Sequence, residues 1–197
     1  DLEVTNISDM GAITLRWMKP QTDKVIDYYI VQVNGRDLNQ SGLVPDEDGW
    51  ITTTLSQNLD QEYIIRVQAH FSDGDYTGRY SDPVTASTLI PVPDAPVLGD
   101  VTTQVVNNGD EFTVNWTPVA ENVKGYRVYI VAQDGSQLAT DVNGANMSSA
   151  VIQTSATSRN YNVYVTARNS GGMGESVIWK ESARSTMKAI STLTASD

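Results

Sequence analysis

Two short stretches of the chain alternate between apolar and polar residues and end in a tryptophan. The first stretch is Ile13–Trp17 and the second is Phe112–Trp116. Successive side chains of a β-strand point to opposite faces, so each stretch directs three apolar side chains toward a core and two polar ones toward water. Because a tryptophan ring buries on the order of 200 Å², we expect each one to dominate the core around it.

Other stretches have the periodicity or the aromatic and β-branched composition of β-strands. No segment places apolar residues at helical spacing over about ten positions, the minimum for a convincing helix. The further predicted strands are 2–7, 28–33, 51–55, 63–69, 83–89, 97–105, 126–131, 150–154, 161–167 and one near 177–187. Asn34-Gly35 is a strong hairpin signal, and 37–49 is expected as a loop or a short edge strand. About seven short strands around each tryptophan predict an all-β protein built of β-sandwiches.

The order of these strands repeats along the chain. Trp17 and Trp116 are 99 positions apart (116 − 17), and Tyr63 and Tyr161 are 98 apart (161 − 63). Three prolines in Ile90–Pro96 disfavour helix and predict a short extended spacer between the copies. We therefore expect two sandwiches in tandem, at residues 1–91 and 92–188, followed by a tail or the start of a linker at 189–197.

Composition and charge narrow the possible partners. Of 197 residues, 40% are apolar and 19% charged, which is typical of folded domains. The formal net charge is −11, and no basic cluster is present to neutralise a phosphate backbone, so a nucleic-acid partner is not expected. No apolar run approaches the roughly 18 residues of a membrane span, so membrane insertion is not expected. Without cysteine, each core must be held by packing alone.

The sequence offers little for catalysis, and we expect no enzyme, cofactor or metal site. His70 is the single histidine, and the strand alternation predicts an exposed imidazole rather than a buried base. The acidic pairs Asp46/Asp48 and Asp73/Asp75 lack the ligand spacing of an EF-hand loop, and turn chemistry accounts for both.

Aromatic and arginine side chains outside the expected core are the candidate binding residues. Such residues on a rigid scaffold supply contact area at low entropic cost. The alternative is that each ring packs over a strand end and covers the core. The candidates are Trp50, Tyr76, Arg79, Tyr80, Arg168 and Trp179, with Arg168 placed in a loop spanning 168–175.

Both halves resemble fibronectin type III domains. The matching features are the proline-led first strand of the second copy, the tryptophan strand, the third-strand tyrosine and the Tyr-x-Val/Ile-x-Val-x-Ala strand, each in the family's order. The resemblance implies immunoglobulin-like sandwiches with a tyrosine corner at Tyr63 and Tyr161. The family's leucine six residues before that tyrosine is replaced by Gln57 and Ser155, so we expect a reshaped corner.

We interpret the chain as a non-enzymatic structural or adhesion module of an extracellular or surface protein. It would space and present binding loops for a protein or glycan partner, as part of a longer chain or assembly. Two alternatives remain at this stage: a phage virion component that decorates a tail or capsid, located on the virion surface, and an accessory domain pair of a secreted carbohydrate-active enzyme.

Overall fold

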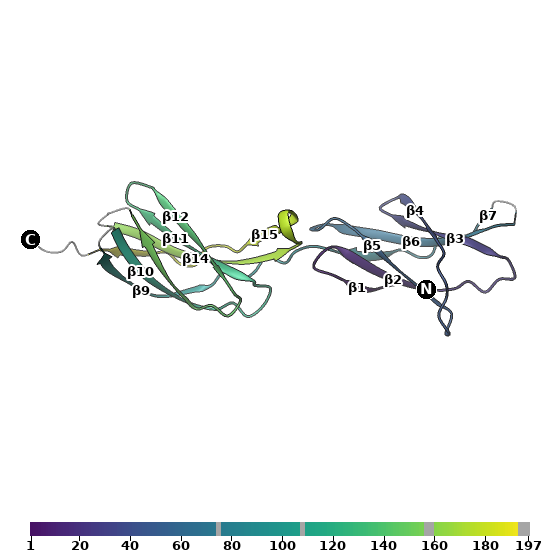
Figure 1. Ribbon diagram of the computed structural model, residues 1–197, viewed down its shortest axis with the longest axis horizontal. Helices are drawn as coiled ribbons and strands as arrows, with labels where there is room; N and C mark the ends of the chain where they lie inside the picture. Colours follow the sequence, from purple (N-terminus) through teal and green to yellow (C-terminus); the bar gives the residue numbers. More distant parts are fainter. Residues whose placement is uncertain (74–75, 107–108, 156–159, 193–197) are drawn as a thin grey trace, which may run out of the picture. The chain divides into compact units, whose positions relative to one another are not determined.

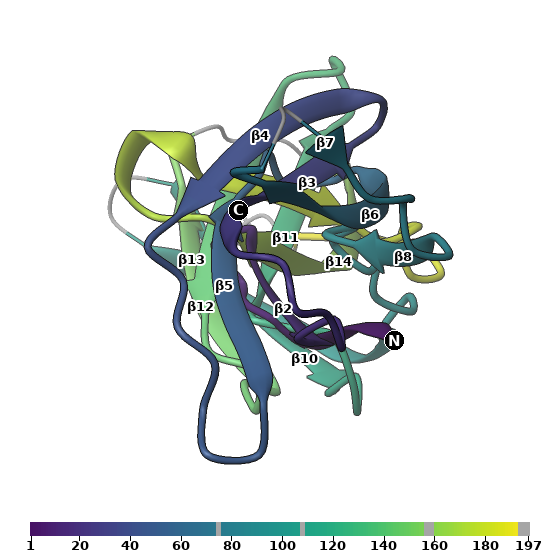
Figure 2. The ribbon, with the colours of Figure 1, turned by 90° about the vertical axis from the view of Figure 1, so that its right-hand side faces the viewer.

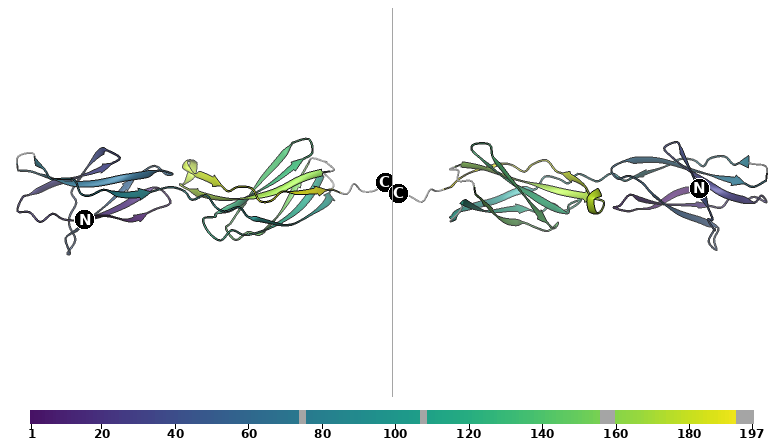
Figure 3. Two further views of the ribbon diagram at one scale, coloured as in Figure 1. Left: turned by 180° about the vertical axis from the view of Figure 1, so that it is seen from behind. Right: turned by 45° about the horizontal axis from the view of Figure 1, so that its top comes forward.

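The computed structural model describes residues 1–73, 76–106, 109–155 and 160–192 (Figure 1). The chain forms two compact units, one of residues 1–89 with 171–176 and the other of residues 90–170 with 177–197. Within the described residues the only helical element is a single 3₁₀ turn, η1 (Gly174–Ser176), as the two views of Figure 3 illustrate. The expected all-β fold class is confirmed.

The first unit is a sandwich of two sheets. Its smaller sheet has the order β1-β2-β5, and the larger has the order β4-β3-β6-β7 with β8 also paired to β6. Figure 2 shows β2 and β5 in one layer and β3 and β6 in the other. The strands are β1 (Leu2–Ile7), β2 (Ala12–Met18), β3 (Ile26–Val33), β4 (Arg36–Ser41), β5 (Trp50–Ser56), β6 (Glu62–Phe71), β7 (Tyr76–Thr77) and β8 (Val84–Ser87).

The second unit repeats this arrangement. One sheet has the order β13-β10-β9, and the other has the order β12-β11-β14-β15 with β16 paired to β14. The strands are β9 (Val97–Val106), β10 (Gly109–Thr117), β11 (Gly125–Ala132), β12 (Gln137–Asn143), β13 (Ser149–Thr154), β14 (Asn160–Gly171), β15 (Ile178–Glu181) and β16 (Lys188–Ser191). Two similar sandwiches in one chain confirm the predicted tandem repeat.

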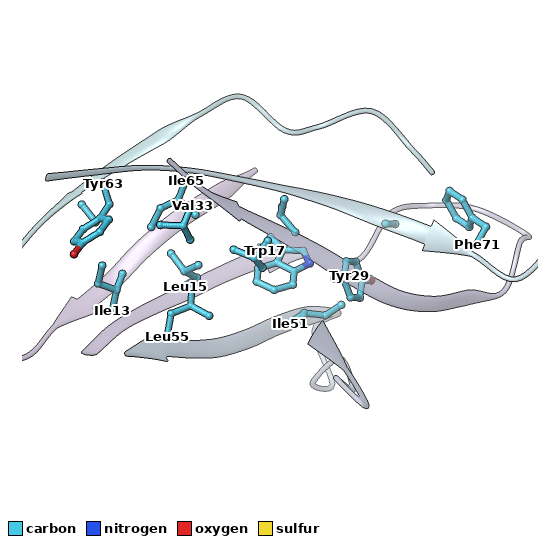
Figure 4. Close-up of a cluster of buried hydrophobic side chains, with 14 residues drawn as sticks. Ile13, Leu15, Trp17, Tyr29, Val33, Ile51, Leu55, Tyr63, Ile65 and Phe71 are labelled. Atoms are coloured by element: carbon cyan, nitrogen blue, oxygen red, sulfur yellow. The ribbon is translucent and has the colours of Figure 1, made fainter. Parts of the chain in front are cut away.

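Each core is centred on its tryptophan. Trp17 is 2% exposed and meets the edge of the Tyr29 ring at a centroid distance of 5.3 Å, with Leu15 and Ile51 beside it (Figure 4). In the second unit Trp116 is 4% exposed and lies 5.2 Å from the ring of Tyr126. The burial predicted from the alternating pattern is confirmed for both indoles.

Three sequence-based expectations are wrong. Residues 189–191, expected in a tail, belong to β16, whose Ile190 lies opposite Tyr161. Arg168, expected in a loop, lies inside β14 because the ladder with β11 continues to the Gly125–Arg168 pair. The imidazole of His70 is not exposed: the side chain is 12% exposed and stacks on Tyr28, which lies opposite it in the β3–β6 register.

The hydroxyls of Tyr63 and Tyr161, the two tyrosines at the expected corners, both donate hydrogen bonds. The Tyr63 hydroxyl donates to the backbone oxygen of Asn58 at 2.9 Å, so the first unit keeps a tyrosine corner. The hydroxyl of Tyr161 donates to Asp110 Oδ2 at 2.6 Å, and both residues are buried. The first unit therefore does not have the reshaped corner expected from the sequence, and for the second unit the segment that precedes Tyr161, residues 156–159, lies outside the described residues.

The last strand of each unit is interrupted by serines that bond to the neighbouring strand. The backbone N–H of Ser81 donates to the Val67 oxygen at 2.8 Å, and its Oγ accepts the Val67 N–H at 3.1 Å. Ser185 makes the same pair of bonds with Val165, at 2.9 and 3.0 Å. The serine side chain thus takes the place of a backbone acceptor and divides the strand into β7 and β8, or β15 and β16.

Removing one indole should unfold one unit. We expect Trp17→Ala to destabilise the first unit by about 3–5 kcal/mol, because it deletes the largest core side chain and leaves a cavity. Amide hydrogen exchange on the full chain in urea would measure each unit separately, with Trp116→Ala as the reciprocal variant. A single transition shared by both units would contradict the expectation.

Removing one corner hydroxyl should affect the second unit more than the first. Tyr161→Phe removes the hydroxyl that donates to the buried side chain of Asp110, and we expect a loss of about 2–3 kcal/mol. Tyr63→Phe removes a hydrogen bond to the backbone oxygen of Asn58, and we expect a loss of about 1 kcal/mol. The double variant Tyr161→Phe/Asp110→Ala should recover part of the loss in urea unfolding; equal costs for the two single variants would refute this account.

Candidate binding face of the second unit

The outward side of the β12-β11-β14-β15 sheet carries charged and aromatic side chains. Strand register places Arg127 opposite both Asp141 and Thr166, and Tyr129 opposite Tyr164. These residues alternate along β11 and β14 with core residues such as Val128 and Val165, so they face away from the core. We call this surface the Arg–Trp face. Its residues are Arg127, Tyr129, Asp141, Tyr164, Thr166, Arg168, Trp179 and Glu181.

Arg168 and Trp179 form its most distinctive contact. The guanidinium of Arg168 lies 4.2 Å from the centroid of the indole ring, within cation–π range. Arg168 is only 7% exposed, and its Nη1 lies 2.7 Å from Asp141 Oδ2. Trp179 remains 43% exposed. A buried arginine thus holds one side of the ring and leaves the rest of it available to solvent.

A paired arginine and carboxylate fix the centre of the face. Arg127 donates from Nε to Asp141 Oδ1 at 2.5 Å and from Nη2 to Asp141 Oδ2 at 3.0 Å, which is bidentate geometry. The hydrogen bond to Asp141 raises the pKa of Arg127. In return, the hydrogen bond from Arg127, followed by that from Arg168, lowers the pKa of Asp141 despite partial burial. Both groups are therefore fully charged at neutral pH.

Glu181 and two stacked tyrosines complete the face. Glu181 Oε1 accepts hydrogen bonds from the hydroxyls of Tyr129 and Thr166, each at 2.5 Å. The rings of Tyr129 and Tyr164 stack at 4.6 Å with an angle of 16°. Burial, and then the hydrogen bond to Glu181, raise the pKa of Tyr129, so the phenol stays neutral. The side chains of the face are therefore largely fixed by contacts with one another.

The structure brings together some of the predicted binding residues. Arg168 and Trp179 meet in the second unit. In the first unit Arg79 and Tyr80 line the same cavity, and the Tyr80 hydroxyl donates to Asp37 at 2.8 Å. Trp50 lies on the other sheet of that unit, at the start of β5, with the guanidinium of Arg16 at 4.2 Å from its ring. Tyr76 begins β7, and its side chain lies outside the described residues.

Sequence reasoning missed most of the Arg–Trp face. The outward positions of the predicted strand 126–131 contain Arg127 and Tyr129, and this pattern alone could have indicated them. Asp141 lies in β12, which lacks a strongly apolar face and was not predicted as a strand. Its pairing with Arg127 depends on the register between the two strands, which only the structure gives.

The described residues form neither a metal centre of acidic, histidine or cysteine side chains nor a membrane-spanning helix. Across the described ranges, no group of three or more histidine, cysteine, aspartate or glutamate residues is arranged to hold a metal ion. The same part of the chain contains no helix long and apolar enough to cross a membrane.

Comparison with known proteins identifies a family for part of the chain. Residues 94–180 match the fibronectin type III domain family. No curated protein matches the chain. Among solved structures, a two-domain fibronectin type III segment of chicken tenascin is 21% identical, with 98% of each chain covered and a TM-score of 0.38. The FN1–FN3 domains of chicken CNTN1 are 19% identical, with 98% of this chain and 66% of that chain covered and a TM-score of 0.42.

The lowered pKa of Asp141 makes the second unit sensitive to acid. Folding favours the carboxylate, so its stabilisation is complete above the unfolded pKa and is lost as pH falls through the folded pKa. We expect urea unfolding of this unit to show a loss of stability below about pH 4. Asp141→Asn should be less stable at pH 7 and lose less on acidification.

The matched control is Asp94→Asn, because Asp94 is an exposed carboxylate of the same unit with no ion pair among the described residues. Its pH profile should equal that of the unmodified chain. If the stability of Asp141→Asn had the same pH profile as that of the unmodified chain, the assigned role of Asp141 would be contradicted.

Proposed function

We propose that this chain, whose second unit is a fibronectin type III domain and whose first unit repeats the same strand order, is a binding module of an extracellular protein. Fibronectin type III domains generally serve as structural, adhesion or binding modules in such proteins. The proposed partner is another protein, and the proposed contact surface is the Arg–Trp face. The observation that carries this proposal is the half-exposed indole of Trp179 held by the buried Arg168.

The composition of the face supports a protein partner. Tryptophan, tyrosine and arginine are the residues that most often dominate the binding energy of protein interfaces. Here they are ordered before any partner arrives, by the Arg127–Asp141 pair and the Tyr129–Tyr164 stack. Binding therefore loses little side-chain entropy, which otherwise amounts to about 0.5–1.5 kcal/mol for each side chain immobilised.

The area of the face indicates a weak interaction. The four strands lie about 4.8 Å apart. β15 has 4 residues, and β12, β11 and β14 have 7, 8 and 12, which gives a surface of roughly 400–500 Å². A standard stable interface buries about 800 Å² on each partner. The face alone supplies about half of this, so we expect a dissociation constant in the micromolar range.

A polysaccharide partner is less well supported. A sugar ring could stack on Trp179, but the guanidinium of Arg168 already occupies one side of the indole. The ring therefore cannot be enclosed between two sugar units. The charged pairs beside it also suit the polar groups of a protein surface.

The test is binding of the full chain to immobilised extracellular-matrix proteins (collagen, laminin and fibronectin) and to cellulose, chitin, xylan and heparan sulfate. We expect at least one protein to bind with micromolar affinity, and Trp179→Ala to weaken that binding by about tenfold or more. Trp50→Ala is the matched control, since it removes the other arginine-contacted indole from a different sheet, and it should bind normally.

Three results would overturn the proposal. Unchanged binding by Trp179→Ala would show that the face is not used. Absence of binding to every protein would remove the proposed partner class, and binding to polysaccharide alone, lost in Trp179→Ala, would assign the same face to a sugar.

A further inference from the structure

All five methionines of the chain are exposed. Their exposed fractions lie between 37% and 67%, although methionine is among the residue types most often buried in folded proteins. The buried clusters that form the two cores consist of aliphatic and aromatic residues without methionine. Because the chain also lacks cysteine, neither of these clusters contains a sulfur atom. The five residues are Met10, Met18, Met147, Met173 and Met187.

The methionines lie in connections and at strand ends. Met10 is in the turn that joins β1 to β2, and Met147 is in the connection between β12 and β13. Met18 ends β2 on the side of the sheet away from the core. Met173 and Met187 directly precede η1 and β16. None of the five belongs to a core cluster, so a change in the polarity of the sulfur alters no contact within those clusters.

The separation of these side chains does not favour a shared docking surface. Methionines that bind a partner are grouped on one adaptable apolar surface. Met10 precedes β2 and Met18 ends it, so a strand of 7 residues, roughly 20 Å long, separates the two within one unit. Met147 and Met187 belong to the other unit. Exposure of the sulfur is the property that the five side chains share.

Oxidation is the reaction to which an exposed thioether is open. The sulfur attacks one oxygen of hydrogen peroxide, the O–O bond breaks, and a sulfur–oxygen bond forms. The sulfur gives up two electrons to the peroxide and becomes a sulfoxide, and the second peroxide oxygen leaves as water. At a buried position the new polar oxygen would lack a hydrogen-bond partner, which is unfavourable. At an exposed position water supplies that partner, so the fold tolerates the product.

We propose that the five methionines are oxidation sites at which the chain consumes peroxide while both units stay folded. Each chain takes up five oxygen atoms, one at each sulfur. The two cores are unaffected, because the buried clusters contain no thioether to oxidise. These sites include no residue of the Arg–Trp face, so the proposal does not depend on the partner of that face.

The test treats the full chain with excess hydrogen peroxide in the absence of denaturant. Intact-mass measurement counts the oxygen atoms gained, and peptide mapping locates each one. We expect a gain of five oxygen atoms, one at each methionine. Amide hydrogen exchange in urea should give each unit the same unfolding midpoint before and after the treatment. Fewer than five oxygen atoms, or a lower midpoint of either unit after oxidation, would overturn the proposal.

The matched control is Leu15→Met, which adds a thioether at a fully buried position of the first core and nearly conserves side-chain volume. Ile130→Met makes the same comparison in the second core. The introduced thioether should react at least about tenfold more slowly than the other five, because peroxide reaches it only when the unit opens. After oxidation in urea, the altered unit should refold with a lower midpoint. The proposal fails if both introduced thioethers react as fast as the native ones, or if their oxidation leaves the midpoint unchanged.

Discussion

The contact between one indole and one phenol ring organises each unit. Trp17 comes from one sheet and Tyr29 from the other, so their edge contact joins the two layers of the sandwich, and Trp116 and Tyr126 do the same in the second unit. Because the chain contains no cysteine, no covalent bond supports this junction. Strand alternation directs the indole ring of Trp17 into the core, and other core side chains, such as Leu15 and Ile51, pack around it.

Strand alternation also explains which parts of the fold could be predicted. Apolar side chains at every second position share one face only when the segment is a β-strand. For this reason the strands that contain Trp17, Tyr63 and Trp116 could be predicted from the sequence. Edge strands show a weaker apolar–polar alternation. β12 and β16 were missed because their burial depends on pairing with a neighbour, and Arg168 was misplaced because the ladder extends beyond the apolar pattern.

The candidate site was predicted only in part for the same reason. Trp179 and Arg168 could be proposed from residue type, but their contact requires knowledge of how β14 and β15 lie beside each other. The two units have the same strand order but different side chains on the outward side of the larger sheet. Where the second has charged pairs and stacked tyrosines, the first stacks Tyr28 on His70. Core positions follow from the fold, whereas the outward positions are free to differ between copies.

The serines that interrupt the last strands have a consequence for association between molecules. An uninterrupted strand at the edge of a sheet offers a row of free backbone groups to a strand from another chain, which promotes aggregation. The hydroxyls of Ser81 and Ser185 accept hydrogen bonds from the backbone N–H groups of Val67 and Val165 in the neighbouring strand. A second molecule therefore meets a broken ladder at this edge, and many such domains can be crowded together in solution without joining their sheets.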